Sequence, residues 1–224
     1  MTKTGIIAVL TGDLVDSSSY SQSHMEAIIQ RLNMEFKSIV ADSSANSLNF
    51  SMFRGDSFQG ITENLGSALI LALRIKALVN SYSAQGNGRN KTPIADIRIS
   101  IGIGEGHYDT KEIHISTGEA FQLSGRTLDE MKSKNETMRL TTSNPEINEE
   151  FTVHMKMLDS LISRWSISSA EVVYFLLNNY KERIIADKLN RSQAAINLRK
   201  KASGWEEIKI LLNRYEQVIK KYFS

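Results

Sequence analysis

Two aspartates that directly follow glycines are the residues best suited to chemistry. Asp13 comes after Gly12, at the end of the apolar run 5–10, and Asp56 comes after Gly55 between two alternating segments. Carboxylates that converge repel each other unless a cation lies between them, and a divalent metal ion is the common solution. The pair therefore predicts a site for Mg²⁺ or Mn²⁺. The alternative is that both Gly-Asp pairs are ordinary turns, where these residues are frequent.

The residues around these aspartates also predict contacts with phosphate. Gly55 lets a phosphate group approach the backbone closely. The stretch after Asp13 precedes a predicted helix, and backbone N–H groups at a helix N-terminus bind anions. The nucleotide or phosphate ligand is therefore expected to contact Leu14, Val15, Ser17, Ser18 and Gly55.

Hydrophobic periodicity predicts the elements that position these residues. Apolar residues three and four apart indicate helices, and strict alternation indicates strands. The resulting order β-α-β-β-α-β, with a βαβ-like extension, predicts an α+β fold of ferredoxin-like or palm type, with helices on one face of an antiparallel sheet. The expected strands are 5–10, Leu48–Phe53, Ser57–Thr62, 97–103, Glu112–Ser116 and Met138–Thr142, and the expected helices are Gln22–Val40, Leu65–Val79 and Gly118–Lys132.

Four sequence blocks resemble a known family. They are Thr11-Gly12-Asp13-Leu14-Val15, Phe53-Arg54-Gly55-Asp56-Ser57-Phe58, Arg98-Ile99-Ser100-Ile101-Gly102-Ile103-Gly104 and Gly118-Glu119-Ala120-Phe121-Gln122-Leu123-Ser124-Gly125-Arg126. Together they resemble the bacterial SatD family over most of the chain. Over residues 5–142 they also resemble a distant class III nucleotidyl cyclase domain.

The cyclase resemblance implies roles for four residues. Asp13 and Asp56 correspond to the metal-binding aspartates, Arg126 to the arginine that stabilises the transition state, and Gln122 to the asparagine that assists it. The implied chemistry is phosphoryl transfer with two metal ions. From spacing alone, Arg126 is equally compatible with a solvated position on an amphipathic helix.

The resemblance departs at the two positions that read the base. Met52 stands where a cyclase has a lysine, and Ile115 stands where it has an acidic residue. The resemblance therefore implies metal and phosphate binding, with purine recognition lost or altered.

The C-terminal third has the pattern of a helix-turn-helix. Ala186 and Ile196 stand at the positions that pack two crossing helices, Asn190 stands where the turn needs positive φ, and Ser192 caps the next helix. An earlier helix is expected to be capped by Ser168 or Ser169. We place the domain boundary after residue 148, which leaves an α/β domain (1–148) and an all-α domain (149–224).

The charge distribution favours contact between the C-terminal domain and DNA. Residues 151–224 contain 13 Lys and Arg against 7 Asp and Glu, whereas the rest contains 14 against 18. A basic end suggests a polyanionic partner. The alternative is a three-helix packing module with a solvated basic face. The expected DNA contacts are Arg191, Ser192, Gln193, Asn197, Arg199, Lys200 and Lys201.

A final apolar stripe has heptad-like spacing, with Trp205, Ile208, Leu212, Tyr215, Ile219 and Tyr222. It either packs within its own domain or forms a homodimer contact. The chain has no cysteine, and no apolar run is long enough for a membrane span, so we expect a cytoplasmic protein.

These features leave three hypotheses for function. The first is a DNA-binding regulator whose cyclase-like domain senses a nucleotide through Mg²⁺. The second is an active divergent cyclase or phosphotransferase with an accessory helix-turn-helix. The third is a non-catalytic interaction protein.

Overall fold

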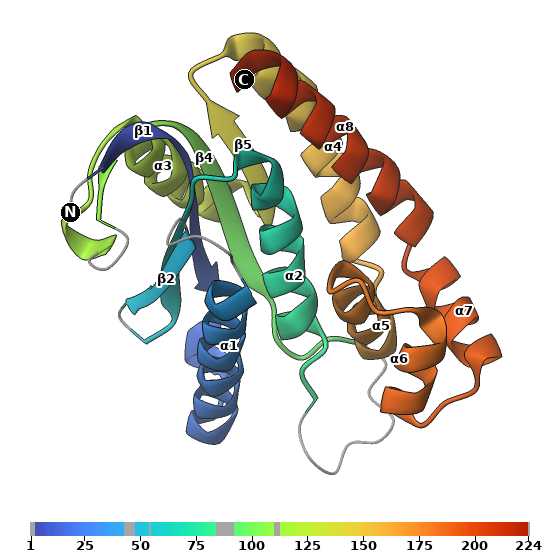
Figure 1. Cartoon of the computed structure of the whole chain (residues 1–224). Helices are drawn as coiled ribbons and strands as arrows, with labels where there is room; N and C mark the ends of the chain where they lie inside the picture. Colours follow the sequence, from blue (N-terminus) through green and yellow to red (C-terminus); the bar gives the residue numbers. More distant parts are fainter. Residues whose placement is uncertain (1–2, 43–47, 54, 84–91, 110–112, 224) are drawn as a thin grey trace.

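The computed structural model describes residues 3–42, 48–53, 55–83, 92–109 and 113–223. Within these residues, five strands form one sheet in the order β2-β3-β1-β4-β5 (Figure 1). The strands are β1 (Lys3–Leu14), β2 (Leu48–Phe53), β3 (Ser57–Thr62), β4 (Ile97–Tyr108) and β5 (Met138–Thr142).

The first four strands have the ferredoxin-like order and directions. β1 pairs antiparallel with both β3 and β4, and β2 pairs antiparallel with β3. The last pair agrees with the expected βαβ-like extension, because β5 runs parallel to β4, so the sheet as a whole is mixed and not purely antiparallel. A parallel neighbour requires a long crossover connection. The helix α3 (Glu119–Lys134) supplies it.

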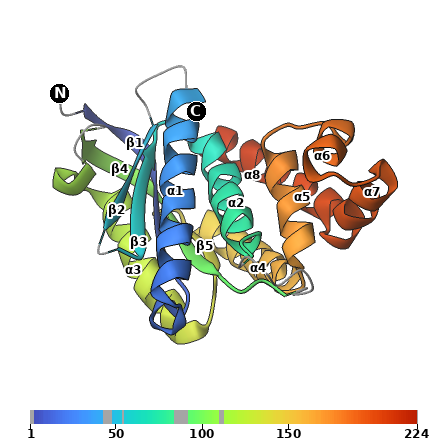
Figure 2. The same cartoon turned by 90° about the horizontal axis from the view of Figure 1, so that it is seen from below.

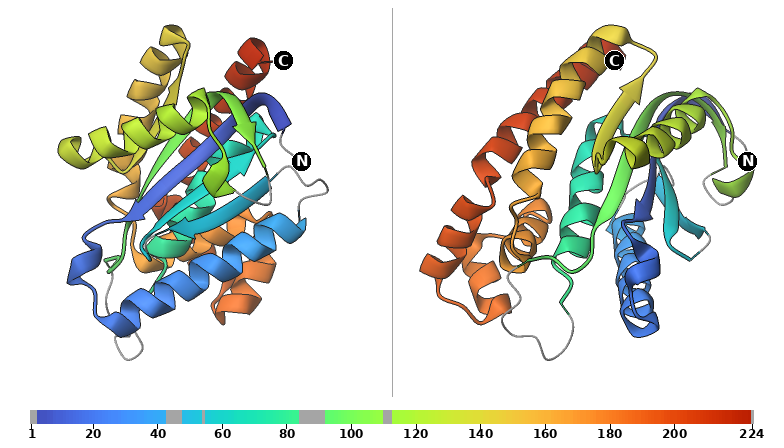
Figure 3. Two further views of the ribbon diagram at one scale, coloured as in Figure 1. Left: turned by 90° about the vertical axis from the view of Figure 1, so that its left-hand side faces the viewer. Right: turned by 180° about the vertical axis from the view of Figure 1, so that it is seen from behind.

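The two faces of the sheet carry different helices. Ala8 and Leu10 belong to the main core with α1 (Gln22–Asp42) and α2 (Ala68–Asn80), whereas Ile7 and Val9 pack with Ala120 of α3. Successive side chains of a strand point to opposite faces, so α1 and α2 cover one face and α3 the other. Figures 1 and 3 show α2 and α3 on opposite sides of β4. The expectation that all helices share one face is wrong for α3.

Close contact between α3 and the sheet depends on a glycine in β4. A Cβ atom at Gly102 would lie 2.5 Å from the amide nitrogen of Ser124, on the α3 backbone. On the neighbouring strand, the Thr11 and Ser124 hydroxyls form a hydrogen bond of 2.9 Å. The small residue therefore lets α3 lie directly on β1 and β4, and α3 carries several of the predicted site residues.

Five helices complete the chain, and they pack on the α2 side. They are α4 (Pro145–Ile162), α5 (Ile167–Leu177), α6 (Glu182–Leu189), α7 (Gln193–Ala202) and α8 (Trp205–Phe223). Figure 2 shows α1, α2 and α5 side by side, with α6 and α7 beyond α5. One hydrophobic core extends from the sheet through α2 into α4, α5 and α8. The expected domain boundary after residue 148 lies within α4, and the division into two domains stays a prediction.

Two local expectations are wrong. Residues Ile113–Ile115 form a 3-10 turn and not a strand, while Glu112 lies outside the described residues. The cap of α5 is Ser166, whose hydroxyl accepts from the Ser169 amide at 3.1 Å. This helix begins earlier than expected, and Ser169 lies buried inside it. Among the described residues, no helix has both the length and the apolar character needed to cross a bilayer.

Candidate functional site

Asp13 lies at the end of β1, in a buried position surrounded by cations. Its Cα atom is paired with Ser57 of β3 on one side and with Arg98 of β4 on the other. The Lys132 ammonium of α3 lies 3.1 Å from Asp13 Oδ2, and the Arg98 guanidinium lies 3.9 Å from Oδ1. Asp13 is only 8% exposed, and its Oδ1 is buried without a hydrogen-bond partner.

Asp56 lies in the turn that leads into β3, directly before Ser57, the residue paired with Asp13. Gly55 precedes it at φ +83°, a left-handed conformation that favours glycine. The Leu14 amide donates to the Asp56 carbonyl oxygen at 3.0 Å, which joins the two segments. The Asp56 carboxylate accepts from the Ser17 hydroxyl at 2.8 Å and from the Ser57 hydroxyl at 3.2 Å. The backbones therefore meet as expected, but the two carboxylates have different partners.

The donor atoms at this end of the sheet fit a magnesium ion bound together with phosphates. Mg²⁺ is commonly held by one or two carboxylates, with water and substrate phosphates completing its coordination. The unpartnered Asp13 Oδ1 is a ligand atom of the required type, and Asp56 lies in the turn that leads into the adjoining strand β3. Among the described residues, no cluster of three or more His, Asp or Glu side chains is arranged for a metal. The chain would therefore supply few ligands of its own.

The predicted phosphate-binding amides are only partly available. Leu14 N donates to Asp56 and Val15 N donates to the Asp96 carbonyl oxygen at 2.9 Å, so neither is free for a ligand. The backbone pairing continues past the end of β1, so a ligand could use these two amides only by displacing their present acceptors. The predicted contacts at Leu14 and Val15 stay predictions. Among the described residues, the amides of residues 16–18 have no acceptor.

The loop after β1 does not lead directly into a long helix. Ser17–Ser19 is a single 3-10 turn, entered through Asp16 at φ 50°, and α1 begins only at Gln22. The predicted contacts at Ser17 and Ser18 therefore lie on a turn, and the Ser17 hydroxyl is directed at Asp56.

A partly buried hydrogen-bond network holds this loop against the sheet. The Tyr20 hydroxyl donates to the Val15 carbonyl oxygen at 2.7 Å and accepts from the Asp96 amide at 3.2 Å. The Asp96 carboxylate in turn lies 2.6 Å from the ammonium of Lys76, which is fully buried in α2. Burial raises the pKa of Tyr20 above its ordinary value, which keeps the hydroxyl protonated as a donor. The loop position therefore depends on the α2 core.

Arg126 and Gln122 lie on the exposed side of α3. Among the described residues, neither side chain forms a hydrogen bond or ion pair, and neither contacts Asp13 or Asp56. The α3 residue that does reach Asp13 is Lys132. The sequence prediction missed Lys132 and Arg98. The available signal for Arg98 was a lone cation in an alternating apolar strand.

The two apolar positions at the expected base-reading sites differ in exposure. Met52 in β2 is half-buried and packs against the main core, whereas Ile115 is 57% exposed. Neither offers a hydrogen-bond donor or acceptor to a purine.

The helices α6 and α7 have the predicted turn geometry. Asn190 adopts φ 49°, and the Ser192 hydroxyl caps α7 by accepting from the Ala195 amide at 3.2 Å. Ala186 and Ile196 are buried in a small core with Val172 of α5. The three helices therefore pack against one another locally, while the helix-turn-helix assignment itself stays a prediction.

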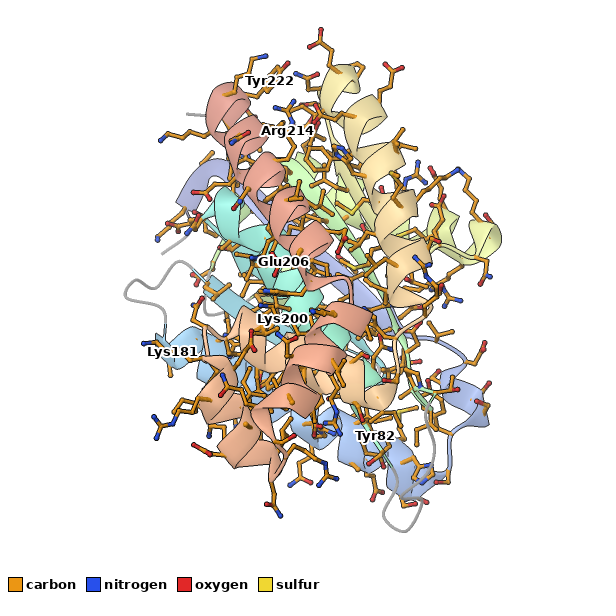
Figure 4. The ribbon with its side chains drawn as sticks, turned by 90° about the vertical axis from the view of Figure 1, so that its right-hand side faces the viewer. Tyr82, Lys181, Lys200, Glu206, Arg214 and Tyr222 are labelled. Atoms are coloured by element: carbon orange, nitrogen blue, oxygen red, sulfur yellow. The ribbon has the colours of Figure 1, made fainter. Side chains whose placement is uncertain are left out.

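The predicted DNA-contacting residues divide into two groups. Arg199 is paired with Glu171 at 3.6 Å. Lys200 is paired with Glu182 of α6 at 2.9 Å and with Glu206 of α8 at 3.4 Å, in the region labelled in Figure 4. These two cations neutralise carboxylates within the chain. The exposed members are Arg191, Ser192, Gln193 and Lys201, while Asn197 is half-buried.

The heptad-like stripe of α8 packs within the chain. Trp205, Ile208, Tyr215 and Ile219 are buried in the main core, and the Tyr215 hydroxyl donates to the Leu65 carbonyl oxygen at 2.6 Å. The stripe therefore packs within the chain, on the predicted α/β domain as well as on its own domain. A homodimer therefore stays a prediction that this stripe does not support.

No family model matches the chain, so the SatD resemblance is not confirmed. No curated protein matches it either.

Several solved structures are similar at a low level. One is the monomeric guanylyl cyclase domain of the RhoGC fusion protein from the aquatic fungus Blastocladiella emersonii (18% identity, 70% of this chain and 88% of that chain, TM-score 0.45). A second is a bacterial light-regulated adenylyl cyclase (13% identity, 62% and 77%, TM-score 0.45). A third is the active GGEEF domain of a diguanylate cyclase from Vibrio cholerae (14% identity, 62% and 83%, TM-score 0.42). All three are nucleotide cyclase domains, but similarity at this level assigns no activity to this chain.

Proposed function

We propose that one end of the sheet, where β1 ends between β3 and β4, binds a metal–polyphosphate ligand and catalyses nucleotidyl or phosphoryl transfer. The observation that carries this proposal is the position of Asp13. Its carboxylate is buried, one oxygen is unpartnered, a second aspartate lies in the turn directly before β3, and two cations lie within 4 Å. Carboxylates for a metal and cations for phosphates are the two components that phosphoryl transfer requires.

Asp13 and Asp56 are the proposed metal ligands, and Mg²⁺ or Mn²⁺ would supply charge neutralisation at the phosphates. Arg98 and Lys132 are the cations placed to face phosphate oxygens from the same end of the sheet. In the reaction class, a hydroxyl oxygen attacks phosphorus and loses its proton to solvent, while pyrophosphate (nucleotidyl transfer) or a nucleoside diphosphate (phosphoryl transfer) leaves. Arg126 and Gln122 stay predicted catalytic residues, and their exposure leaves them open to a second copy of the chain or to the substrate.

The apolar positions Met52 and Ile115 favour a ligand that is recognised through its phosphates. We therefore expect ATP, GTP, CTP and UTP to bind within a few-fold of one another. A base-reading site would instead discriminate strongly, because its polar groups would be left unpaired by the wrong base.

The test is to incubate the protein with each nucleoside triphosphate and Mn²⁺, and to measure both binding and product formation. Asp13→Asn and Asp56→Asn are expected to abolish both signals. Asp187→Asn, an exposed aspartate on α6, is the matched control and is expected to leave them unchanged. Nucleotide binding without product would favour a sensor over an enzyme. Binding that survives both site variants would contradict the proposal.

A second candidate function is DNA contact by α6 and α7, which would make the protein a regulator. The observation that favours it is the turn at Asn190, together with the exposed Arg191, Gln193 and Lys201. Because Arg199 and Lys200 are ion-paired, we assign the phosphate contacts to Arg191 and Lys201. Fluorescence anisotropy with duplex DNA at several salt concentrations tests this. Arg191→Glu with Lys201→Glu is expected to abolish binding, and a complete lack of DNA binding by the wild type would favour an interaction module.

A further inference from the structure

The Lys132 ammonium occupies the position beside Asp13 where a metal ion would bring positive charge. Its Nζ lies 3.1 Å from Asp13 Oδ2, and the only other carboxylate paired with it in the described part of the chain, that of Asp129, lies at 3.9 Å. The Asp129 side chain is 82% exposed, so solvent screens that second contact strongly. Lys132 is therefore directed at the buried carboxylate and not at its helix neighbour.

The surroundings of Asp13 strengthen the electrostatic interactions at this site. The carboxylate is almost fully enclosed, and Arg98 adds a second positive charge at 3.9 Å. A divalent cation placed here faces repulsion from both groups, and this repulsion is strong where water is largely excluded. Free metal is therefore bound weakly while Lys132 stays in place.

Lys132 is also free to move, unlike Arg98. Its side chain is 48% exposed and lies near the C-terminal end of α3, whereas the Arg98 side chain is 14% exposed within the sheet. A lysine ammonium on a four-carbon stem can exchange one anionic partner for another a few ångströms away. Phosphate oxygens that arrive with a metal ion would be such a partner.

We propose that Lys132 acts as an exchangeable counterion, so that the site accepts a preformed metal–polyphosphate complex and discriminates against free metal. On binding, the ammonium leaves Asp13 and pairs with phosphate, which removes the repulsion and adds an attraction in one movement. This inference rests on the proposed metal–phosphate site and specifies the form in which its ligand binds. Lys132 is therefore a specificity-determining residue at this site.

The experiment is calorimetric titration with two probes, Mn²⁺ alone and the preformed Mn²⁺–tripolyphosphate complex. Wild type is expected to bind the complex at least tenfold more tightly than the free ion. Lys132→Gln is expected to bind free Mn²⁺ at least tenfold more tightly than wild type and the complex several-fold more weakly. Lys134→Gln removes a similar charge from the same helix end, where it pairs with Glu130 at 3.7 Å, and is expected to change neither affinity.

Opposite shifts for the two probes distinguish counterion exchange from a structural role, which would move both affinities the same way. Unchanged or weaker binding of free Mn²⁺ by Lys132→Gln would overturn the inference. The proposed metal–phosphate site would survive that result if wild type binds the complex and Asp13→Asn does not. If neither probe binds wild type or Lys132→Gln, both the inference and the proposed metal site are wrong.

Discussion

The ion pair between Lys76 and Asp96 supports the loop at the candidate site, and its two partners are in unequal environments. Lys76 is fully buried, and its ammonium also donates to the Ile97 carbonyl oxygen at 2.9 Å. The Asp96 side chain is 37% exposed, so water can solvate its charge. The stability of the pair should therefore depend on which partner is removed.

Asp96→Asn leaves the ammonium of Lys76 buried without its main counterion. Removing one partner of a buried pair costs about 3–5 kcal/mol. The lower end, about 3 kcal/mol, is expected, because the ammonium keeps its bond to Ile97 and the favourable charge of Asp159. Lys76→Met leaves only the partly solvated carboxylate, which still accepts from Asn80 at 2.8 Å, so we expect a loss of about 1 kcal/mol.

Urea denaturation followed by circular dichroism measures these free energies of unfolding, with the slope checked for two-state behaviour. The double variant Lys76→Met/Asp96→Asn is expected to be more stable than Asp96→Asn alone, because no unpaired ammonium remains. The reasoning would be refuted if Lys76→Met lost more stability than Asp96→Asn, or if the double variant were the least stable of the three.

Three further predictions concern the packing of α8, α7 and α3. Tyr215→Phe removes the hydrogen bond to the Leu65 carbonyl oxygen, which still accepts from the Ala68 amide, and should lower the free energy of unfolding by about 1 kcal/mol in the same assay. The hydrogen bond from Lys200 lowers the pKa of Glu182 below 4.5, so its stabilisation exists above that pH and disappears as pH falls through the lowered pKa. Thermal melts of wild type and Glu182→Gln should therefore differ at pH 7 and converge as the pH falls through the lowered pKa of Glu182; a constant difference would contradict this. Gly102→Ala should push α3 from the sheet, costing about 1–3 kcal/mol in urea and weakening Mn²⁺–nucleotide binding.

Much of the fold follows from local patterns in the sequence. The bounds of β2, β3 and β5 match the expected ones, because each strand alternates and is bounded by turn residues. The face that α3 covers could not be predicted in this way. An apolar stripe on a helix shows that one side is buried, but it does not show which side of a sheet the helix covers. That choice follows from the parallel crossover between β4 and β5.

The candidate site shows the same division between local and long-range information. The positive φ of Asn190 and the approach of β1 to β3 depend on turn residues and strand alternation, and both were predictable. The partners of Asp13 come from β4 and from the far end of α3, over 80 residues away in sequence. No spacing rule connects such positions, because they meet only when the whole sheet has formed. The cations that decide what this carboxylate can bind are therefore a property of the tertiary structure. For that reason, the affinities of Lys132→Gln are a sharper test of the site than the aspartate motifs themselves.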